Sequence, residues 1–511
     1  MSKSPRAPAA VLVVAIFAAI GAHGAVDGAK PPAQGSPAKT SNEIFRQKFV
    51  DHCSSCHGLD LAGGRAPSLF DQTLLESRTD EALHHTIDAG RPAAGMPAFN
   101  GVLSDDEIWK LILFLRTSAG AMKGKPPFVE SPDDHIVDSK KQKFRLEVVA
   151  SGLEVPWGMA FLPDGRLLVT ERPGRLRIIE NGRLLPKPVA GTPTVRVGHD
   201  AGMFDIAVHP DYRRNGWIYL SYAETLPGDA EPPPSGDASA RSPSPPSMTV
   251  IVRGKLEGDR WVQTQTIFRA PPALYTSAGV HYGSRFTFDR AGHLFFSIGD
   301  RGSIAAAQDL STPLGKIHRV NDDGSVPSDN PFVRTQGAVP TIWSYGHRNP
   351  QGFAWDPVTG LLWASEHGPG GGDEINIIER GRNYGWGVIT MGRQPGIAKR
   401  AEPGMEQPIV YYTPSIAPSG IAFYSGERYP RWRNNLFVAG LAGQQLRRLE
   451  IQDRRVVAQE VLFQQFGRTR AAIVGPEGLL YVLLQSPTGG MTGLNLEAST
   501  PGMVVRLVPV D

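Results

Sequence analysis

Six segments of the chain share one rhythm: an apolar strand, a turn rich in proline, aspartate and glycine, and a second apolar strand. A unit of this size cannot bury its own apolar face, so the units must stack against one another. Repeated antiparallel units of this kind are typical of a β-propeller, and six repeats predict six blades. The segments are PWGMAFLPDGRLLVTE from Pro156, FDIAVHPDYRRNGWIYLSY from Phe204, SRFTFDRAGHLFFSIGD from Ser284, QGFAWDPVTGLLWASE from Gln351, SGIAFYSGERYPRWRNNLFVAG from Ser419 and AAIVGPEGLLYVLLQ from Ala471.

The two ends of this repeating region are expected to meet. Phe144 to Val149 and Met503 to Val508 each read as a further strand outside the six segments. We expect the first or the last of them to close the ring by completing a shared blade.

The chain begins with the features of a secretory signal over residues 1–24. Lys3 and Arg6 precede a short apolar run from Val11 to Ile20. A membrane span needs about 20 apolar residues, so we favour a cleaved signal over a retained anchor. This predicts a periplasmic protein that does not span the membrane once the signal is removed. Residues 25–40, rich in proline, glycine, alanine and lysine, read as a linker.

The chain has two cysteines, Cys53 and Cys56, and His57 follows the second directly. Cysteines at this spacing form thioethers to haem vinyl groups, and the adjacent histidine binds the iron as an axial ligand. The alternatives are a redox disulfide, which would want a βαβ context, and a zinc site, which needs further Cys or His partners nearby. Met96, beside a rigid proline, is the expected second axial ligand, with Met122 as its rival.

Helical patterns flank this motif. Apolar residues at helical spacing within residues 41–57 predict a helix that runs into the CxxCH motif, and another helix starts after a capping box formed by Ser104 to Glu107. Over residues 41–120 the helix, CxxCH motif, methionine loop and closing helix resemble a small class I cytochrome c. Residues 121–142 are polar and contain proline, so we read them as a second linker.

The fold class that follows is a multidomain chain: a small all-α cytochrome c domain and then an all-β six-bladed β-propeller over residues 143–511. Abundant glycine (57) and proline (44) fit an architecture with many turns. Residues 226–248 are Pro/Ser-rich and poor in apolar side chains, which predicts a disordered surface insertion. The formal net charge of +3, without a basic stripe, excludes a nucleic-acid partner.

Residues 345–374 look like the place where the propeller presents a site. Phe353 to Trp355 and Leu361 to Ala364 read as two short strands around a Pro/Gly turn. A charged loop precedes this hairpin and a glycine-rich loop follows it. Irregular loops at the rim of a β scaffold commonly carry function, although Gly/Pro clusters are also ordinary turns.

The propeller segments also carry a family resemblance. In order along the chain, HYGSRFTFDRAGHLFFSIGDRG, LGKIHRVNDDGSVPSDNPF, YGHRNPQGFAWDP, EHGPGGGDEINIIERGRNYGW and FGRTRAA resemble the soluble PQQ-dependent glucose and aldose sugar dehydrogenases. The resemblance covers most of residues 143–511. It implies a propeller whose upper face binds pyrroloquinoline quinone (PQQ) and calcium, and which oxidises an aldose at its anomeric carbon to a lactone.

The resemblance assigns roles to three polar residues. His281 matches the general base, because a neutral imidazole can take the hydroxyl proton; a structural turn histidine is the alternative, as we judge His209 to be. Arg348 matches the arginine beside the quinone carbonyl, where a permanent cation stabilises developing negative charge. Asn349 matches a residue that hydrogen-bonds PQQ.

The same resemblance implies six further site residues, two for the cofactor's carboxylates and four for calcium. Arg468 and Arg470 match an Arg-x-Arg pair that binds the cofactor's carboxylates, and on a strand their side chains share one face; a solvated basic rim is the alternative. Gly368 and Pro369 match the pair whose backbone carbonyls hold calcium, a hard cation that takes such oxygens readily. A further structural calcium is implied at Glu374 and Tyr384.

Three positions depart from the family pattern. The family's cofactor-binding lysine aligns with Ala442, a glutamine near the active site aligns with Asp200, and the Asp or Asn before the catalytic histidine is Val280. Loss of the lysine removes one charge-assisted contact of about 1.5–3 kcal/mol, so PQQ binding should weaken rather than vanish. Asp200 and Val280 alter the sugar pocket.

The leading hypothesis is a periplasmic quinohaemoprotein that oxidises an aldose and passes electrons from reduced PQQ singly to its fused haem c, and then to a downstream acceptor. The first alternative is a non-catalytic propeller that binds ligands or proteins, because fold does not fix function. The second is that the cytochrome alone is functional and the propeller docks a partner redox enzyme. PQQ binding separates the three.

Overall fold

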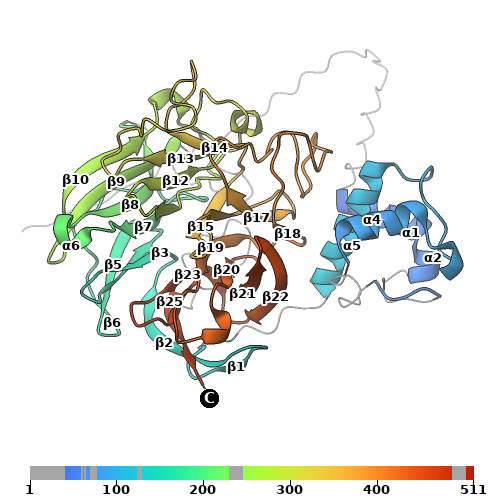
Figure 1. Cartoon of the computed structure of the whole chain (residues 1–511), viewed down its shortest axis with the longest axis horizontal. Helices are drawn as coiled ribbons and strands as arrows, with labels where there is room; N and C mark the ends of the chain where they lie inside the picture. Colours follow the sequence, from blue (N-terminus) through green and yellow to red (C-terminus); the bar gives the residue numbers. More distant parts are fainter. Residues whose placement is uncertain are drawn as a thin grey trace, which may run out of the picture.

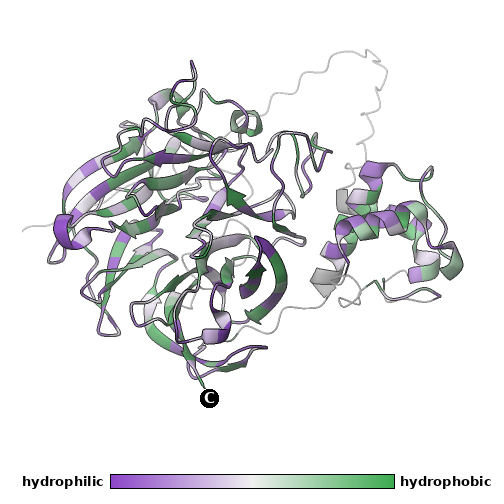
Figure 2. Ribbon diagram, viewed as in Figure 1, coloured by the Kyte–Doolittle hydropathy of each residue, from purple (hydrophilic) through white to green (hydrophobic). Residues whose placement is uncertain are grey.

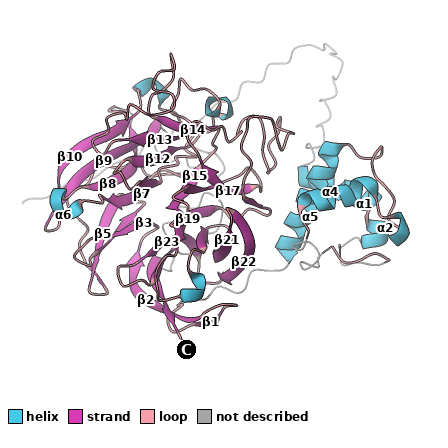
Figure 3. Ribbon diagram, viewed as in Figure 1, coloured by secondary structure: helices cyan, strands magenta, loops and turns pink. Residues whose placement is uncertain are grey.

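A computed structural model describes residues 41–58, 61, 65–69, 78–122, 129, 131–228, 245–485 and 502–510 of the chain. The predicted signal over residues 1–24 and the first linker lie outside the described residues. The molecule has a helical part and a β-sheet part, with the helices in blue at one side of the sheets (Figure 1). Figure 3 shows the same division by element type. The predicted multidomain fold class is confirmed.

The helical domain packs around one apolar core. Its elements are α1 (Ser41–His52), α2 (Ser54–His57), α4 (Asp80–Ala89), the 3-10 helix η1 (Pro92–Ala94) and α5 (Asp105–Met122). The expected capping box opens α5, since the Ser104 backbone N–H donates to the Glu107 carboxylate at 2.9 Å. The core side chains are Phe49, Leu61, Ile87, Phe99, Leu103, Ile108, Leu111, Ile112 and Leu115.

The sheet region is a six-bladed propeller, as the six repeats predict. Blade one contains β3 (Pro156–Phe161), β4 (Leu167–Glu171), β5 (Arg175–Glu180) and β6 (Arg183–Leu184), and blade two contains β7 (Met203–Val208), β8 (Ile218–Thr225), β9 (Ser247–Glu257) and β10 (Arg260–Arg269). Blade three contains β11 (Phe286–Phe288), β12 (Leu294–Ile298), β13 (Lys316–Val320) and β14 (Ile342–Tyr345). Blade four contains β15 (Pro350–Trp355), β16 (Leu362–Glu366), β17 (Asp373–Ile378) and β18 (Val410–Tyr412), and blade five contains β19 (Pro418–Phe423), β20 (Leu436–Gly440), β21 (Gln445–Gln452) and β22 (Arg455–Phe463). Short helices α6 (Tyr212–Asn215), η2 (Pro272–Leu274), η3 (Ile304–Ala307) and η4 (Pro430–Trp432) lie in the connections.

The sixth blade closes the ring with strands from both ends of the propeller region. It runs in the order β1 (Ile136–Asp138), β2 (Lys143–Leu153), β25 (Gly502–Pro509), β24 (Leu480–Gln485) and β23 (Arg468–Val474). The innermost strands β3, β7, β11, β15, β19 and β23 contact one another in a closed circle. Both expected end strands therefore contribute to the shared blade, where the sequence required only one of them.

The blades are joined near the axis by a repeated hydrogen bond. The hydroxyls of Thr170, Ser221, Ser297 and Ser365, each on the second strand of its blade, donate to a carbonyl at the innermost strand of the next blade. Crowding at the axis also requires glycine: a Cβ on Gly352 would lie 2.1 Å from the Ser419 carbonyl oxygen. Apolar residues run along the blade strands (Figure 2), which buries the faces between neighbouring blades.

Two segment boundaries differ from the sequence prediction. Helix α5 reaches Met122 and β1 lies within the predicted linker over residues 121–142, where it pairs with β2. The predicted insertion over residues 226–248 is shorter at its end, because Ser247 and Met248 begin β9 by pairing with the last residues of β8. Residues 229–244 lie outside the described part. Among the described helices, none combines the length and the apolar character that crossing a membrane would require.

Candidate active site

Most of the predicted propeller site residues lie at one end of the ring. In each blade the innermost strand and the second strand are antiparallel, so the loop before the former and the loop after the latter emerge at the same end. His281 precedes β11, Arg348 and Asn349 precede β15, and Gly368 follows β16. Residues far apart in the sequence are thereby brought onto one face.

His281 is held by a buried carboxylate. Its Nδ1 lies 2.6 Å from Oδ1 of Asp300, a residue that is 1% exposed and follows β12. Asp300 also accepts hydrogen bonds from the Trp386 indole at 2.6 Å and from the Gly302 backbone N–H at 2.8 Å. Burial favours the protonated acid, but the hydrogen bond and charge of His281 hold the pKa of Asp300 below its ordinary value. A carboxylate accepts only, so Nδ1 carries the proton and Nε2 is left as a base.

Arg348 is fixed beside this pair by Glu366 and His367. Its backbone N–H donates to the Glu366 carboxylate and its guanidinium donates to the His367 carbonyl oxygen at 3.1 Å. The guanidinium carbon lies 5.4 Å from the centre of the Trp386 ring. Burial lowers the pKa of Arg348, and the carboxylates of Asp300 and Glu366 act in the opposite direction. The site therefore holds a partly desolvated cation close to the His281–Asp300 pair.

Asn349 connects two blades. Its side-chain oxygen accepts hydrogen bonds from the Gly283 backbone N–H and from the Gln351 amide, both at 3.1 Å. Asn349 thus fixes the loop that carries His281. The amide nitrogen of Asn349 is the atom left for a ligand, so the predicted contact with PQQ stays a prediction about that atom.

Arg468 and Arg470 lie at the start of β23, but not as a regular strand pair. The register of β23 shifts between Thr469 and Ala471, so Arg470 is a bulge residue and simple alternation does not describe it. That the two side chains share one face stays a prediction. Their charges still interact, because Arg468 is among the cations that depress the pKa of Arg470.

A third arginine, Arg172, joins this pair. It follows β4, is 7% exposed, and donates hydrogen bonds to the carbonyl oxygens of His199 and Ala201. Burial, and then the cations Arg468, Arg172 and Arg285, lower the pKa of Arg470 well below its usual range. Asp200 is the carboxylate that opposes this effect.

These cations are short of partners. In the described part of the chain, the buried Nε atoms of Arg172, Arg348, Arg468 and Arg470 have no hydrogen-bond acceptor. Asp200 is the carboxylate that acts on all four guanidinium groups. Buried like charges with unused donors favour a bound polyanion, so the cluster is suited to a ligand with several carboxylates.

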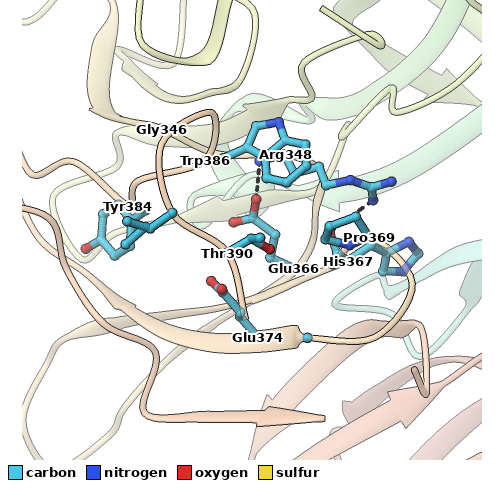
Figure 4. Close-up of a pocket in the computed structure, with 12 residues that line it drawn as sticks. Gly346, Arg348, Glu366, His367, Pro369, Glu374, Tyr384, Trp386 and Thr390 are labelled. Carbon is cyan, nitrogen blue, oxygen red and sulfur yellow. Dashed lines mark hydrogen bonds between the residues drawn. The ribbon is translucent and has the colours of Figure 1, made fainter. Parts of the chain in front are cut away.

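A small pocket lies next to Arg348 (Figure 4). Its lining residues are Gly346, Arg348, Glu366, His367, Gly368, Pro369, Gly372, Glu374, Tyr384, Trp386, Ile389 and Thr390. The four positions that the resemblance assigns to calcium therefore all line this pocket. The Pro369 carbonyl already accepts a hydrogen bond from the Arg393 backbone N–H at 2.6 Å, which leaves one lone pair for a cation.

Glu374 and Tyr384 differ in what they offer a cation. Glu374 lies directly opposite Glu366 in the β16–β17 pairing. Burial and the charge of Glu366 raise the pKa of Glu374 to about 8. The Tyr384 hydroxyl instead donates to the Ile377 carbonyl oxygen at 2.5 Å and accepts from the Glu379 backbone N–H at 2.8 Å, so it is turned to the backbone. Within the described residues, no group of three His, Cys, Asp or Glu side chains is arranged to hold a metal.

The four predicted haem residues belong to the helical domain. Cys53 and Cys56 are free thiols, and Cys53 and Met96 pack against the same apolar core. The His57 Nδ1 donates to the Pro67 carbonyl oxygen at 2.9 Å. That bond orients the ring and leaves Nε2 as the nitrogen with which His57 could bind a metal. The rival ligand Met122 is the last residue of α5.

Sequence reasoning gave no role to Asp300, Glu366 or Arg172. Each is charged and stands at or directly after the end of the second strand of its blade, where the site loops begin. The position of these residues at the end of the second strand could have identified them from the sequence. That inference needs the end of the propeller that carries the site to be known.

Two family models match the chain. The glucose / sorbosone dehydrogenase model matches residues 153–493. The model of cytochrome c oxidase, cbb3-type, subunit III matches residues 23–115.

Individual relatives agree with this division. The aldose sugar dehydrogenase YliI of Escherichia coli is 38% identical over 354 residues, which are 67% of this chain and 91% of that protein. The PQQ-bound structure of an aldose sugar dehydrogenase from Streptomyces coelicolor has a TM-score of 0.55 and 28% identity, covering 72% of this chain and 99% of its own. Cytochrome c55X of Pseudomonas aeruginosa is 39% identical over 68 residues, 13% of this chain and 56% of that protein.

Proposed function

The chain belongs to the glucose/sorbosone dehydrogenase family, with a cytochrome c domain on its N-terminal side, and we propose that it oxidises an aldose at the anomeric carbon to a lactone with PQQ as cofactor. Both resemblances predicted from the sequence are thereby confirmed. The names of the E. coli and S. coelicolor relatives support the aldose and the PQQ parts of the proposal. The observation that carries it is the His281–Asp300 pair beside a cluster of buried, under-partnered arginines.

The arginine cluster fits PQQ, which carries three carboxylates. Arg172, Arg468 and Arg470 offer buried donors without acceptors, and a tricarboxylate would supply both charge and acceptors. The family lysine that Ala442 replaces is missing, but Arg172 places a guanidinium in the same cluster as the arginine pair. We infer that this cluster holds the cofactor's carboxylates.

The chain's own residues supply proton transfer and charge stabilisation. Asp300 keeps the proton of His281 on Nδ1, so Nε2 can accept the proton of the sugar's anomeric hydroxyl. Bound PQQ supplies the two-electron acceptor that takes the hydride from the same carbon. Arg348, held by Glu366 and the His367 carbonyl, stabilises negative charge that develops on the acceptor oxygen. Burial and the cations Arg348 and Arg470 lower the pKa of His367 to about 3, so His367 stays neutral during this step.

Calcium is proposed at the pocket wall formed by Gly368 and Pro369. Their carbonyl oxygens are the type of ligand that calcium prefers. Glu374 lines the same pocket, and a cation there would favour its carboxylate form over the acid. The Tyr384 hydroxyl is committed to the backbone, so a contact of Tyr384 with a further calcium would have to come from another atom.

The haem is proposed to carry electrons out of the propeller. Oxidation of one sugar releases two electrons and two protons, whereas one haem iron accepts a single electron as it goes from ferric to ferrous. Cys53 and Cys56 would bind the haem covalently, and His57 and Met96 would ligate its iron. A downstream one-electron acceptor must reoxidise the iron between the two transfers.

We further propose a periplasmic location. The support is the signal-like composition of residues 1–24. Fractionation of cells and determination of the mature N-terminus test it. Purified protein that still begins at residue 1 would contradict cleavage.

The non-catalytic propeller is kept as a second candidate because of one observation, the alanine at position 442. A titration of haem-loaded protein with PQQ separates the two candidates. We expect binding that weakens about tenfold to a hundredfold in Arg172→Gln, as expected for loss of one charge-assisted contact. Arg214→Gln, on the exposed helix α6, is the matched control and should bind as the wild type does. No binding of PQQ by the wild-type protein would sink the dehydrogenase proposal.

A further inference from the structure

The helical domain contacts the propeller through the face of α5 that carries Trp109 and Leu113. Leu111, Ile112 and Leu115 point into the helical core. Trp109 and Leu113 lie four residues apart and so share another face of the helix. Leu113 is 9% exposed although it does not belong to the helical core, and its Cδ1 lies 3.1 Å from where a Cβ on Gly371 of the propeller would be. The propeller therefore covers this second face.

Arg400 of the propeller is the centre of the contact. Its guanidinium carbon lies 4.1 Å from the centre of the Trp109 ring and 5.5 Å from the centre of the Tyr411 ring. Its Nη2 lies 3.4 Å from Oδ2 of Asp80, the first residue of α4. A guanidinium over an aromatic face and against a carboxylate is a desolvated, directional contact.

Asp80 is buried and also pairs with an arginine of its own domain. Its side chain is 7% exposed, and its other oxygen accepts from Arg116 Nε of α5 at 2.7 Å. Burial, and then the Asp80 carboxylate, raise the pKa of Tyr411, which keeps that phenol neutral beside the ion pair. One carboxylate of the helical domain thus serves one arginine of its own domain and one of the propeller, which fixes α4, α5 and the propeller relative to one another.

The propeller side of the contact is built from the walls of the candidate active site. Gly371 belongs to the loop whose Gly368 and Pro369 line the pocket. Tyr411 is the strand partner of Glu374, another lining residue. In Figure 1 the helical domain lies on the β17–β18 side of the ring, in agreement with these contacts.

The chain beside Arg400 is hydrogen-bonded to the pocket lining. Arg400 follows Lys399, whose carbonyl oxygen accepts a hydrogen bond from the backbone N–H of the lining residue Thr390 at 3.0 Å. Arg400 is therefore the direct neighbour of Lys399, a residue whose backbone is hydrogen-bonded to the lining of the pocket.

We propose that Arg400, clamped by Trp109, Tyr411 and Asp80, docks the cytochrome domain on the rim of the active site, and that this docked arrangement is the one in which the haem is reduced. The docking itself stands on the contacts above, whereas its role in electron transfer rests on the proposed function. On the helical side Trp109 packs against the core that also holds Cys53 and Met96, so the contact joins the pocket rim to the haem surroundings.

The first test is hydrogen–deuterium exchange of the haem-loaded full chain, without PQQ or sugar. In Arg400→Ala we expect faster exchange in α5 and in the propeller segment around Lys399, and unchanged exchange in α1 and β15. Lys399→Ala is the matched control, because this neighbouring side chain is 61% exposed and pairs with Glu402 of its own loop. Asp80→Asn breaks the same ion pair from the other side and should reproduce the effect. Exchange in both interface variants equal to that of the wild type would overturn the docking.

The second test measures electron flow in the same variants after addition of PQQ, calcium and sugar. We expect the rate of haem reduction to fall about tenfold or more in Arg400→Ala, because the tether alone keeps the domains near each other without orienting them. Sugar oxidation coupled to a small soluble dye should be unchanged, because the dye takes electrons without the haem. Unchanged haem reduction would overturn the proposal. Absence of dye reduction in the wild type would instead refute the proposed function and leave the docking to the exchange test.

Discussion

At the scale of single residues, the carboxylate of Asp300 sets the orientation and the tautomer of His281. Asp300 occupies Nδ1 of the ring at 2.6 Å and is itself fixed by Trp386 and Gly302. The imidazole is therefore oriented and its tautomer set before any substrate arrives. A histidine on a loop becomes a positioned base because a second loop, from the neighbouring strand, brings the acid that holds it.

Substitution of His281 tests this role. We expect His281→Ala to lower the turnover of dye-coupled sugar oxidation by about 10²–10⁴-fold, the usual contribution of a general base. His293→Ala is the control, because His293 forms a similar pair with Asp289 at 2.8 Å in the turn at the other end of β11. Equal losses in the two variants would show that His281 acts only through the fold.

A different histidine predicts how stability depends on pH. His318 is buried, donates from Nε2 to the Pro313 carbonyl oxygen at 3.0 Å, and lies 2.9 Å from the Thr341 hydroxyl through Nδ1. Burial lowers the pKa of His318 from its ordinary value of 6.5 to about 3. The unfolded chain thus binds this proton first as the pH falls, so His318 leaves stability unchanged above pH 6.5 and lowers it progressively between pH 6.5 and about pH 3.

The measurement is urea unfolding at about pH 7 and at about pH 5, where one such group changes the free energy of unfolding by up to about 1.4 kcal/mol per pH unit. We expect His318→Gln to be less stable at the higher pH and to lose part of the acid dependence. His135→Gln, at an exposed position, is the control. An acid dependence in His318→Gln as steep as that of the wild type would contradict the assignment.

At the scale of elements, the blades are joined by backbone-directed hydroxyls as well as by apolar burial. Ser365 of β16 donates to the Ser419 carbonyl oxygen of β19 at 2.6 Å, and both residues are fully buried. The same contact recurs at Thr170, Ser221 and Ser297. These positions were visible in the repeats as a small hydroxyl residue in an otherwise apolar second strand.

Removal of one such hydroxyl has a defined cost. We expect Ser365→Ala to lower the free energy of unfolding by about 1–3 kcal/mol, because the buried Ser419 carbonyl loses its side-chain donor. Ser311→Ala removes an exposed hydroxyl that bonds Asp309 within a turn and should cost about 0.5 kcal/mol or less. Denaturant unfolding of the two variants decides between these values, and equal costs would contradict the inter-blade role.

The sequence predicted the elements that are buried on both faces. The two inner strands of each blade are near-continuous apolar runs, so the six segments identified them and their turns. Outer strands such as β22, with alternate exposed residues and an irregular register, gave no comparable pattern. The boundary errors have the same origin, because β1 and the start of β9 exist through pairing with strands that the local sequence does not show.

The site was predictable only in part for a similar reason. The CxxCH motif is local, so its chemistry could be derived from spacing. His281, Arg348 and the arginine pair came from a family resemblance, and their positions agree with one face of the ring. The charges of Arg172 and Arg470 interact because the propeller closes, and no spacing in the chain indicates that interaction.

At the scale of the whole molecule, closure of the ring depends on the last strand. β25 lies between β2 and β24 and pairs with both. Truncation before Gly502 would remove the strand that joins β2 to β24 within the sixth blade and would expose two strand edges. We expect such a chain to lose cooperative thermal unfolding and to aggregate.

The control for this truncation is removal of residues 229–244 with a short glycine-serine connection. Thr225 of β8 already pairs with Ser247 of β9, so a shorter loop can join them. We expect this deletion to leave the unfolding temperature unchanged. A truncated chain that unfolds as the full chain does would contradict closure by β25.

The two domains make chemical sense together only if electrons pass between them. In the proposed function the propeller supplies a base, a cation beside the acceptor and a cluster for a polyanionic cofactor, and the helical domain supplies the residues of a haem site. The direct measurement is the absorbance of reduced haem after addition of aldoses to the haem-loaded protein with PQQ and calcium. The account predicts reduction that requires PQQ and is lost in His281→Ala. Reduction that proceeds without PQQ, or no reduction with any aldose, would contradict it.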